Sequence, residues 1–206
     1  MRYTLLALLW ILFALPLSAQ EYAFELWHDG KIVLETGDTL KGKIKYDMQN
    51  DLLQFEVNKH FESYSARKVV FFEIFDSTIK NYRQFYSLPF STAGSYKAPI
   101  FFELMAEGKL TLLARERLEY RTYNSSFYYN NTYSRLVLVN RFYLLRENGR
   151  IDEFGGKKAE WLSLMRPRED DVEKYAKANR LSFDDKLELG RIINYYNSLF
   201  ENNKNE

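Results

Sequence analysis

The shortness of the connections between strand-like segments constrains this chain more than any other feature. From residue 22 to about residue 154, segments with an alternating pattern are separated by brief turns. In the clearest one, residues 39–47, the even-numbered positions are apolar or glycine and the odd-numbered positions are polar. A period of two places one face of a strand on a core and the other in water. Parallel neighbours need crossovers of a dozen or more residues. We therefore predict a mainly antiparallel sheet, either a meander or a partly closed barrel.

Further strands are predicted along the same region. They cover residues 53–57, 67–75, 81–86, 100–106, 109–123, 134–147 and 151–154. The triplets His28-Asp29-Gly30 and Thr36-Gly37-Asp38 are typical of hairpin turns. The longest turn-rich stretch runs from Pro89 to Pro99 and is predicted to divide a first β unit, residues 20–88, from a second, residues 99–156.

After Gly156 the hydrophobic period changes to that of helices. A short helix is predicted over 157–165, stopped by Arg166-Pro167, and a second over 170–179. Ser182 is predicted to cap a third, with Asp185 as its capping-box partner. Its apolar stripe consists of Leu189, Ile192, Ile193, Tyr196 and Phe200. The fold class is therefore α+β, mainly β, with about three helices at residues 157–203 packed on the sheet.

Residues 1–19 have the pattern of a secretory signal peptide. One cation, Arg2, precedes an uncharged apolar run and then Pro16 and Ala19. The apolar run is shorter than the roughly 18 to 20 residues that a membrane-spanning helix requires. We predict cleavage after Ala19, or one or two residues away because Leu17 is larger than usual at its position. The mature chain is then exported to the periplasm, the cell envelope or the medium, without a transmembrane segment.

Composition limits the partners of the mature chain. Removing residues 1–19 deletes one basic and no acidic side chain, which leaves 28 of each sign. Such a balance argues against nucleic acid as the main partner, since nucleic acid is bound by a concentrated positive field. There is no cysteine, which excludes disulfides, thiolate nucleophiles and thiolate metal ligands. An exported domain of this kind must be stabilised by packing.

Residues for catalysis or metal binding are few. The chain has only two histidines, His28 and His60, with Asp29 and Glu62 as the nearest acids. A metal site needs more ligands than such a pair supplies, and no nucleophile motif accompanies either histidine. Carboxylate pairs could serve glycoside hydrolysis, but Glu116 and Glu119 are an odd number apart and point to opposite faces of a strand. We predict no catalytic residue, no metal and no cofactor, and leave enzymatic activity undecided with a non-enzyme favoured.

A tyrosine-rich segment is the one candidate binding site. Rings beside asparagine and arginine side chains can stack on a sugar and bind its hydroxyl groups, although such rings also pack across strands. The candidate ligand-binding residues are Tyr120, Arg121, Tyr123, Tyr128, Tyr129 and Tyr133.

Several phrases of the sequence resemble a group of uncharacterised secreted proteins of Bacteroidetes-type bacteria. They are LETGDTLKGKIKYD, YSARKVVFFEIFD, YRQFYSLPF, FFELMAEGKLTLLARE and YYNSLF, and the resemblance spans most of residues 26–200. It implies an envelope or secreted protein that is β-rich with a helical end. It implies no catalytic residue.

Two functions are compatible with these observations. The first is a non-enzymatic periplasmic or envelope-associated protein that binds another envelope component. The alternative is a carbohydrate-binding or carbohydrate-processing protein that uses residues 120–133. The partner is then an envelope protein or a glycan.

Overall fold

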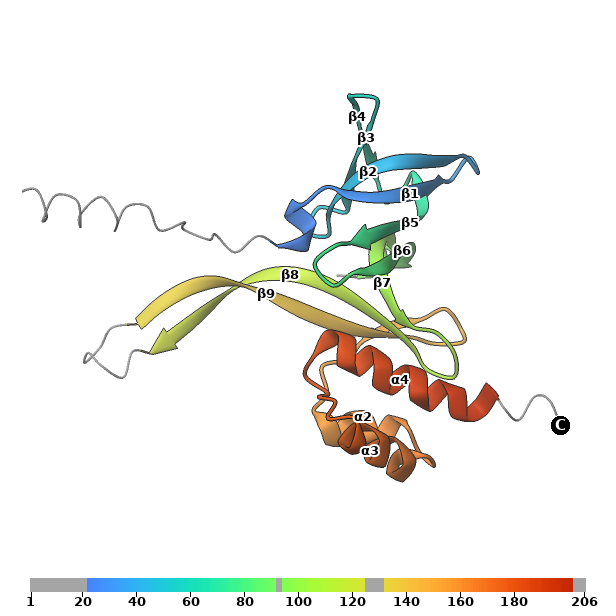
Figure 1. Ribbon diagram of the computed structural model, residues 1–206, viewed down its shortest axis with the longest axis vertical. Helices are drawn as coiled ribbons and strands as arrows, with labels where there is room; N and C mark the ends of the chain where they lie inside the picture. The colour runs from blue at the N-terminus through green and yellow to red at the C-terminus, as the bar shows by residue number, and fades with distance from the viewer. Residues whose placement is uncertain (1–21, 92–93, 125–131, 202–206) are drawn as a thin grey trace, which may run out of the picture.

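The computed structural model describes residues 22–91, 94–124 and 132–201. The predicted signal peptide lies outside these residues. Ten strands precede three α-helices in the described chain (Figure 1). The elements are η1 (Ala23–Glu25), β1 (His28–Leu34), β2 (Thr39–Asp47), β3 (Leu52–Val57), β4 (His60–Ser65), β5 (Val69–Asp76), β6 (Asn81–Phe90), β7 (Ala98–Ala106), β8 (Thr111–Asn124), β9 (Thr132–Leu145), β10 (Ile151–Glu153), α2 (Lys158–Leu164), α3 (Glu169–Ala178) and α4 (Lys186–Glu201).

All ten strands form one open antiparallel sheet. Their order is β10-β9-β8-β7-β6-β5-β1-β2-β3-β4. Strands β1 to β4 form one meander, after which β5 returns to the free edge of β1 and begins a second meander that ends at β10. The predicted antiparallel sheet with a helical end is therefore confirmed. The proposed division at Pro89–Pro99 stays a prediction; in the sheet, Pro89 and Pro99 face each other across β6 and β7.

The prediction that His28-Asp29-Gly30 forms a turn is wrong, because these residues begin strand β1. Glycine is required at position 30 because the backbone of β5 comes very close. A Cβ atom at this position would be 2.2 Å from the carbonyl oxygen of Glu73. Asp29 pairs with Lys43 of β2 at 2.8 Å. The glycine that suggested a turn instead allows strands β1 and β5 to approach each other closely.

The edge strand β4 was missed for a different reason. Its residues are almost all exposed, so it lacks the apolar alternation by which a half-buried strand is recognised.

Three hydrophobic clusters lie along the sheet, and the third and smallest consists of Phe102, Leu113 and Tyr143. The first joins β1 to β7 around Ile32, Phe72 and Phe85. The second lies between the sheet and the helices, where Trp161 of α2 and Ile192 of α4 pack with strand residues such as Leu112 and Leu144. The helices thus cover one end of the sheet, as Figure 1 shows. None of the described helices combines the length and apolarity needed to cross a membrane.

The start of α4 corrects the predicted cap. Ser182 does not cap this helix, which begins three residues later than predicted. Asp185 precedes the first helical residue, and its carboxylate accepts a hydrogen bond from the backbone N–H of Glu188 at 2.9 Å. Asp185 is therefore the N-cap. The Glu188 side chain reaches back to the N–H of Ser182 instead.

Candidate functional site

Strands β8 and β9 form a two-stranded arm that extends away from the body (Figure 1). They pair without interruption from Thr111–Leu145 to Asn124–Thr132. The neighbouring strands stop early, because β7 pairs with β8 only as far as Ala114 and β10 reaches only to Tyr143 of β9. We call residues 115–124 and 132–141 the arm. Apart from Arg115 and Glu116 at its base, which bond to Asp51 and Tyr46 of the body, the two strands of the arm pair only with each other in the described chain.

The register of the arm sorts its side chains into two faces. Residues opposite each other in an antiparallel ladder share a face, and successive residues alternate. The Arg/Tyr face carries Arg117, Glu119, Arg121, Tyr123, Tyr133, Arg135, Val137, Val139 and Arg141. The apolar face carries Leu118, Tyr120, Leu136 and Leu138, with Thr122 opposite Ser134 near its end.

The described tyrosines of the predicted site lie on two faces of the arm. Tyr123 and Tyr133 lie on the Arg/Tyr face with Arg121, whereas Tyr120 lies on the apolar face, where it is 78% exposed. Tyr128 and Tyr129 lie outside the described residues. Of the four predicted residues that the structure describes, Arg121, Tyr123 and Tyr133 share one face.

Aromatic and cationic groups are layered on the Arg/Tyr face. The rings of Tyr123 and Tyr133 stack with centroids 5.6 Å apart and 22° between their planes. The guanidinium carbon of Arg135 lies 4.9 Å from the centre of the Tyr123 ring, a cation–π arrangement. Tyr133 is still 55% exposed. The stack thus presents a flat aromatic surface beside a positive charge.

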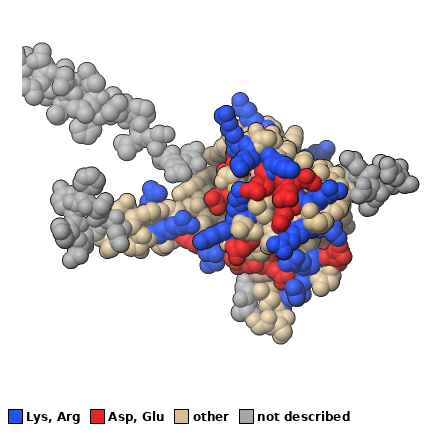
Figure 2. Space-filling view, turned by 90° about the horizontal axis from the view of Figure 1, so that it is seen from below, with Lys and Arg blue, Asp and Glu red and all other residues tan. Residues whose placement is uncertain are grey.

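Positive charge dominates this face. Arg141 donates from Nε and Nη2 to Glu119 at 3.1 and 2.6 Å, and this hydrogen bonding holds the pKa of Glu119 below its ordinary value. The nearby charges of Arg117 and Arg121 act in the same direction. The Arg/Tyr face carries four arginines and one glutamate. Figure 2 shows basic atoms along the arm, whereas both signs mix over the body.

A cavity of about 350 Å³ lies at the base of the Arg/Tyr face. Arg115, Arg117, Arg141 and Tyr143 are among its lining residues. Arg115 is already engaged, because it pairs with Asp51 at 2.8 Å and donates to backbone carbonyl groups. Arg117 and Arg141 are the cations that continue the positive face into this cavity.

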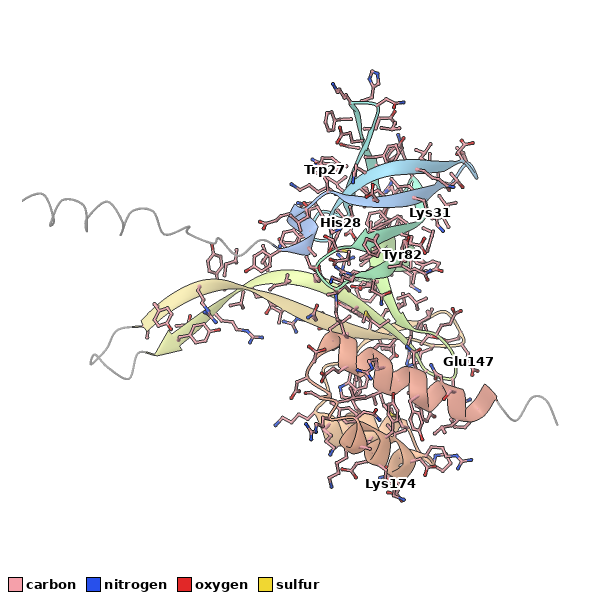
Figure 3. The ribbon with its side chains drawn as sticks, viewed as in Figure 1. Trp27, His28, Lys31, Tyr82, Glu147 and Lys174 are labelled. Atoms are coloured by element: carbon pink, nitrogen blue, oxygen red, sulfur yellow. The ribbon has the colours of Figure 1, made fainter. Side chains whose placement is uncertain are left out.

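The two histidines do not form a site. His28 is buried in β1, and its Nε2 atom lies 2.7 Å from the carbonyl oxygen of Ala23, which ties η1 to the sheet (Figure 3). His60 is exposed on β4, with β2 and β3 between the two strands. In the part of the chain that the structure describes, no three or more His, Asp or Glu side chains are grouped so as to hold a metal ion.

A buried charge network is the feature that the sequence-based search missed. Its centre is Arg83 of β6, which is 5% exposed. Arg83 donates from Nε and Nη2 to Glu103, from Nη1 to Asp76 and Tyr46, and from Nη2 to Glu116. These contacts use all five N–H groups of the guanidinium. Side chains from β2, β5, β6, β7 and β8 are thereby joined at one point.

Lys186 connects this network to the helices. Its Nζ atom, at the start of α4, donates to Glu103 at 2.9 Å and to Glu116 at 2.8 Å. The network thus contains two cations and three carboxylates, with one negative charge in excess. The two glutamates predicted to point to opposite faces of β8 do so: Glu116 is buried in the network and Glu119 lies on the Arg/Tyr face.

Two carboxylates of the network, Glu103 and Asp76, are held in their charged form. Burial acts to raise the pKa of Glu103, but the charges and hydrogen bonds of Lys186 and Arg83 outweigh it and hold the pKa below its ordinary value. Burial also acts to raise the pKa of Asp76, but its hydrogen bonds with Thr78 and Arg83 outweigh burial, so this pKa is lowered as well. Burial raises the pKa of Tyr46 well above its usual value, which keeps its hydroxyl group protonated.

The position of Arg83 offers a signal that could have revealed the network. Arg83 and Phe85 are two residues apart, so they share the core-facing side of β6, and Glu103 has the same relation to Phe101 in β7. A charge at a core-facing position needs buried partners. That rule identifies individual charged residues that need buried partners. Which residues are those partners depends on how the five strands are arranged, and only the structure shows this.

No family model, curated protein or solved structure matches this chain.

Proposed function

We propose that this protein is an exported, non-enzymatic binding protein of the bacterial envelope that holds an acidic envelope component on the Arg/Tyr face of its arm. The observation that carries this proposal is the arm itself. It is a two-stranded ribbon with an exposed, arginine-rich face and stays outside the body of the sheet. An isolated two-stranded ribbon is marginally stable in water, which makes such an arm suited to a partner that covers it.

The charge of the arm supports an acidic partner. Four arginines and one glutamate lie on the Arg/Tyr face, although the mature chain as a whole is balanced. Guanidinium groups bind carboxylates and phosphates with two hydrogen bonds at once, and the flat rings of Tyr123 and Tyr133 add apolar contact. The leader pattern of residues 1–19 supports export. The scarcity of catalytic groups in the sequence supports a non-enzymatic role.

A carbohydrate-binding function is the second candidate, and the layered Tyr133, Tyr123 and Arg135 favour it. The apolar C–H face of a sugar packs on an aromatic ring, while an adjacent guanidinium binds a uronic acid carboxylate. Under this candidate the acidic component is a glycan. Under the first candidate it is an acidic segment of an envelope protein.

Binding of two defined polyanions tests the proposal. We expect purified protein to bind polygalacturonate or poly-glutamate in calorimetry at low salt, with affinity that falls as salt is added. Replacing Arg121 and Arg135 together by Gln should weaken binding by about tenfold or more, since each replacement removes a charge-assisted contact. The matched control replaces Lys41 and Lys174, which are exposed on β2 and α3, by Gln. It removes two positive charges outside the arm.

The outcome separates the candidates. Replacing Tyr123 and Tyr133 by Leu should weaken binding of polygalacturonate but not of poly-glutamate if the partner is a glycan. Equal loss in the control and the arm variants would show that binding follows net charge alone, and the arm would not be the site. Fractionation of native cells with amino-terminal sequencing tests export: the proposal requires a chain outside the cytoplasm that begins near Gln20.

A further inference from the structure

We propose that a second cavity, beneath the apolar face of the arm, binds a small primary amine with an apolar body. We call it the Tyr46–Glu116 cavity. Its volume is about 360 Å³, which is at the lower end of the range for small-molecule sites. Its apolar wall, Leu118 and Leu138, lies on the opposite side of the ribbon from the Arg/Tyr face, and Arg117 of that face lies at its edge. This amine site goes beyond the acidic partner proposed above, because it rests on Glu116 and the apolar face and not on Arg121, Tyr123 or Arg135.

Apolar side chains from three parts of the chain form the walls. Leu118 and Leu138 face each other across β8 and β9, and Phe24 of η1 and Met48, which follows β2, complete the apolar lining. The contact of His28 with Ala23 positions η1, and hence Phe24, against the sheet. These apolar walls suit a hydrocarbon chain or ring.

Two members of the buried network, Tyr46 and Glu116, supply the deepest polar groups of the cavity. They are 2% and 7% exposed. The Oε1 atom of Glu116 accepts from Arg83 and Lys186, whereas Oε2 accepts only from the Tyr46 hydroxyl, at 3.0 Å, among the described residues. A carboxylate oxygen can accept two hydrogen bonds. Oε2 therefore has capacity for a further donor.

The balance of charge identifies that donor as a cation. At the edge of the cavity, Lys45 and Arg117 are matched by Glu25 and Asp47. The network behind it has one negative charge in excess, because Asp76, Glu103 and Glu116 face only two cations. A buried uncompensated charge is costly. An ammonium group at Glu116 would compensate it and donate to Oε2.

Titration with matched six-carbon probes tests this inference. We expect hexylammonium to bind at least about tenfold more tightly than hexan-1-ol in calorimetry, because only the ammonium makes a charge-assisted contact. Hexanoate should not bind in the cavity. In the wild-type protein, hexylammonium should shift the backbone amide resonances of Leu118 and Leu138.

Two variants locate the site. Leu138→Trp fills the cavity without changing charge and should abolish binding, whereas Val137→Trp adds the same ring on the Arg/Tyr face and should leave binding unchanged. Glu116→Gln should remove the preference for the amine over the alcohol, while Glu119→Gln should preserve it.

Three results would overturn the inference. They are undetectable binding of hexylammonium, equal binding of the amine and the alcohol, and full binding by folded Leu138→Trp. If Leu138→Trp does not fold, the wild-type resonance shifts decide, since shifts confined to other residues would place the amine elsewhere. None of these results affects the proposed role of the Arg/Tyr face.

Discussion

Arg83 and Glu103 of neighbouring strands are joined by two parallel hydrogen bonds, from Nε to Oε1 at 2.8 Å and from Nη2 to Oε2 at 2.7 Å. Both side chains are almost fully buried. Such a pair adds little net stability beyond an apolar replacement of both partners, but removing one partner leaves a buried charge uncompensated. Arg83 is therefore expected to be far more sensitive to substitution than the surface arginines.

Arg83→Met should destabilise the fold by about 3–5 kcal/mol, because Asp76 would lose its cationic partner and Glu103 and Glu116 would keep only Lys186. Urea denaturation measures the change. The matched control is Arg141→Met, which also removes two hydrogen bonds to a glutamate but at an exposed site, and should cost under about 1 kcal/mol. Similar losses for both variants would contradict a structural role for the network.

Acid should destabilise the protein through the same network. The pKa values of Asp76 and Glu103 are lowered in the fold, so near pH 4 the unfolded chain binds more protons than the folded one. Their contribution is fully present above their unfolded pKa values of 3.8 and 4.5, and is lost as the pH falls through the lower folded values. Thermal unfolding between pH 7 and pH 2.5 should show this fall. A smaller fall is expected in Asp76→Asn.

Asn197→Ala should loosen helix α4 from the sheet. The side chain of Asn197 accepts from the N–H of Leu110 at 2.9 Å and donates to the carbonyl groups of Leu110 and Glu107 at 2.8 and 3.1 Å. Losing these bonds at a buried position should cost about 1–3 kcal/mol. Amide hydrogen exchange should accelerate in α4 more than in β1 and β5. Asn194→Ala is the control on the same helix, since its one contact, to Met105, is 3.4 Å long.

Gly30→Ala should destabilise the junction of β1 and β5. The added methyl group would lie 2.2 Å from the carbonyl oxygen of Glu73, so the strands would have to separate, at a cost of about 1–3 kcal/mol. Gly155→Ala meets no atom within 4 Å and should leave the melting temperature nearly unchanged. An unaltered melting temperature in Gly30→Ala would mean that the two strands separate without cost.

The strands of the fold could be predicted from the sequence wherever one face is apolar. Residues 39–47 were predicted with the bounds that β2 has, and the long strands β8 and β9 were predicted to within two residues at each end. Residues 60–65 could not be predicted, because an exposed edge strand has no apolar face to reveal it. The triplet at His28 shows that composition alone does not distinguish a turn from a close contact of strands.

The candidate site was only partly predictable. Arg121 and Tyr123 share a face because they are two residues apart on one strand, which is visible in the sequence, and Tyr133 joins them because it pairs with Tyr123 across the ladder. What the sequence does not contain is the point at which β7 and β10 stop pairing, which turns two ordinary strands into an arm. The network of Arg83 depends in the same way on register between distant strands.

The central place of β1 has a consequence for how the protein folds. Strand β1 can form a hairpin with β2 as soon as both are available, but its other side pairs with β5, which follows only after β3 and β4. Closing that larger loop costs chain entropy before it gains contacts. We expect the rate-limiting step to be the capture of β1 by β5, with the hairpin of β8 and β9 formed early and independently.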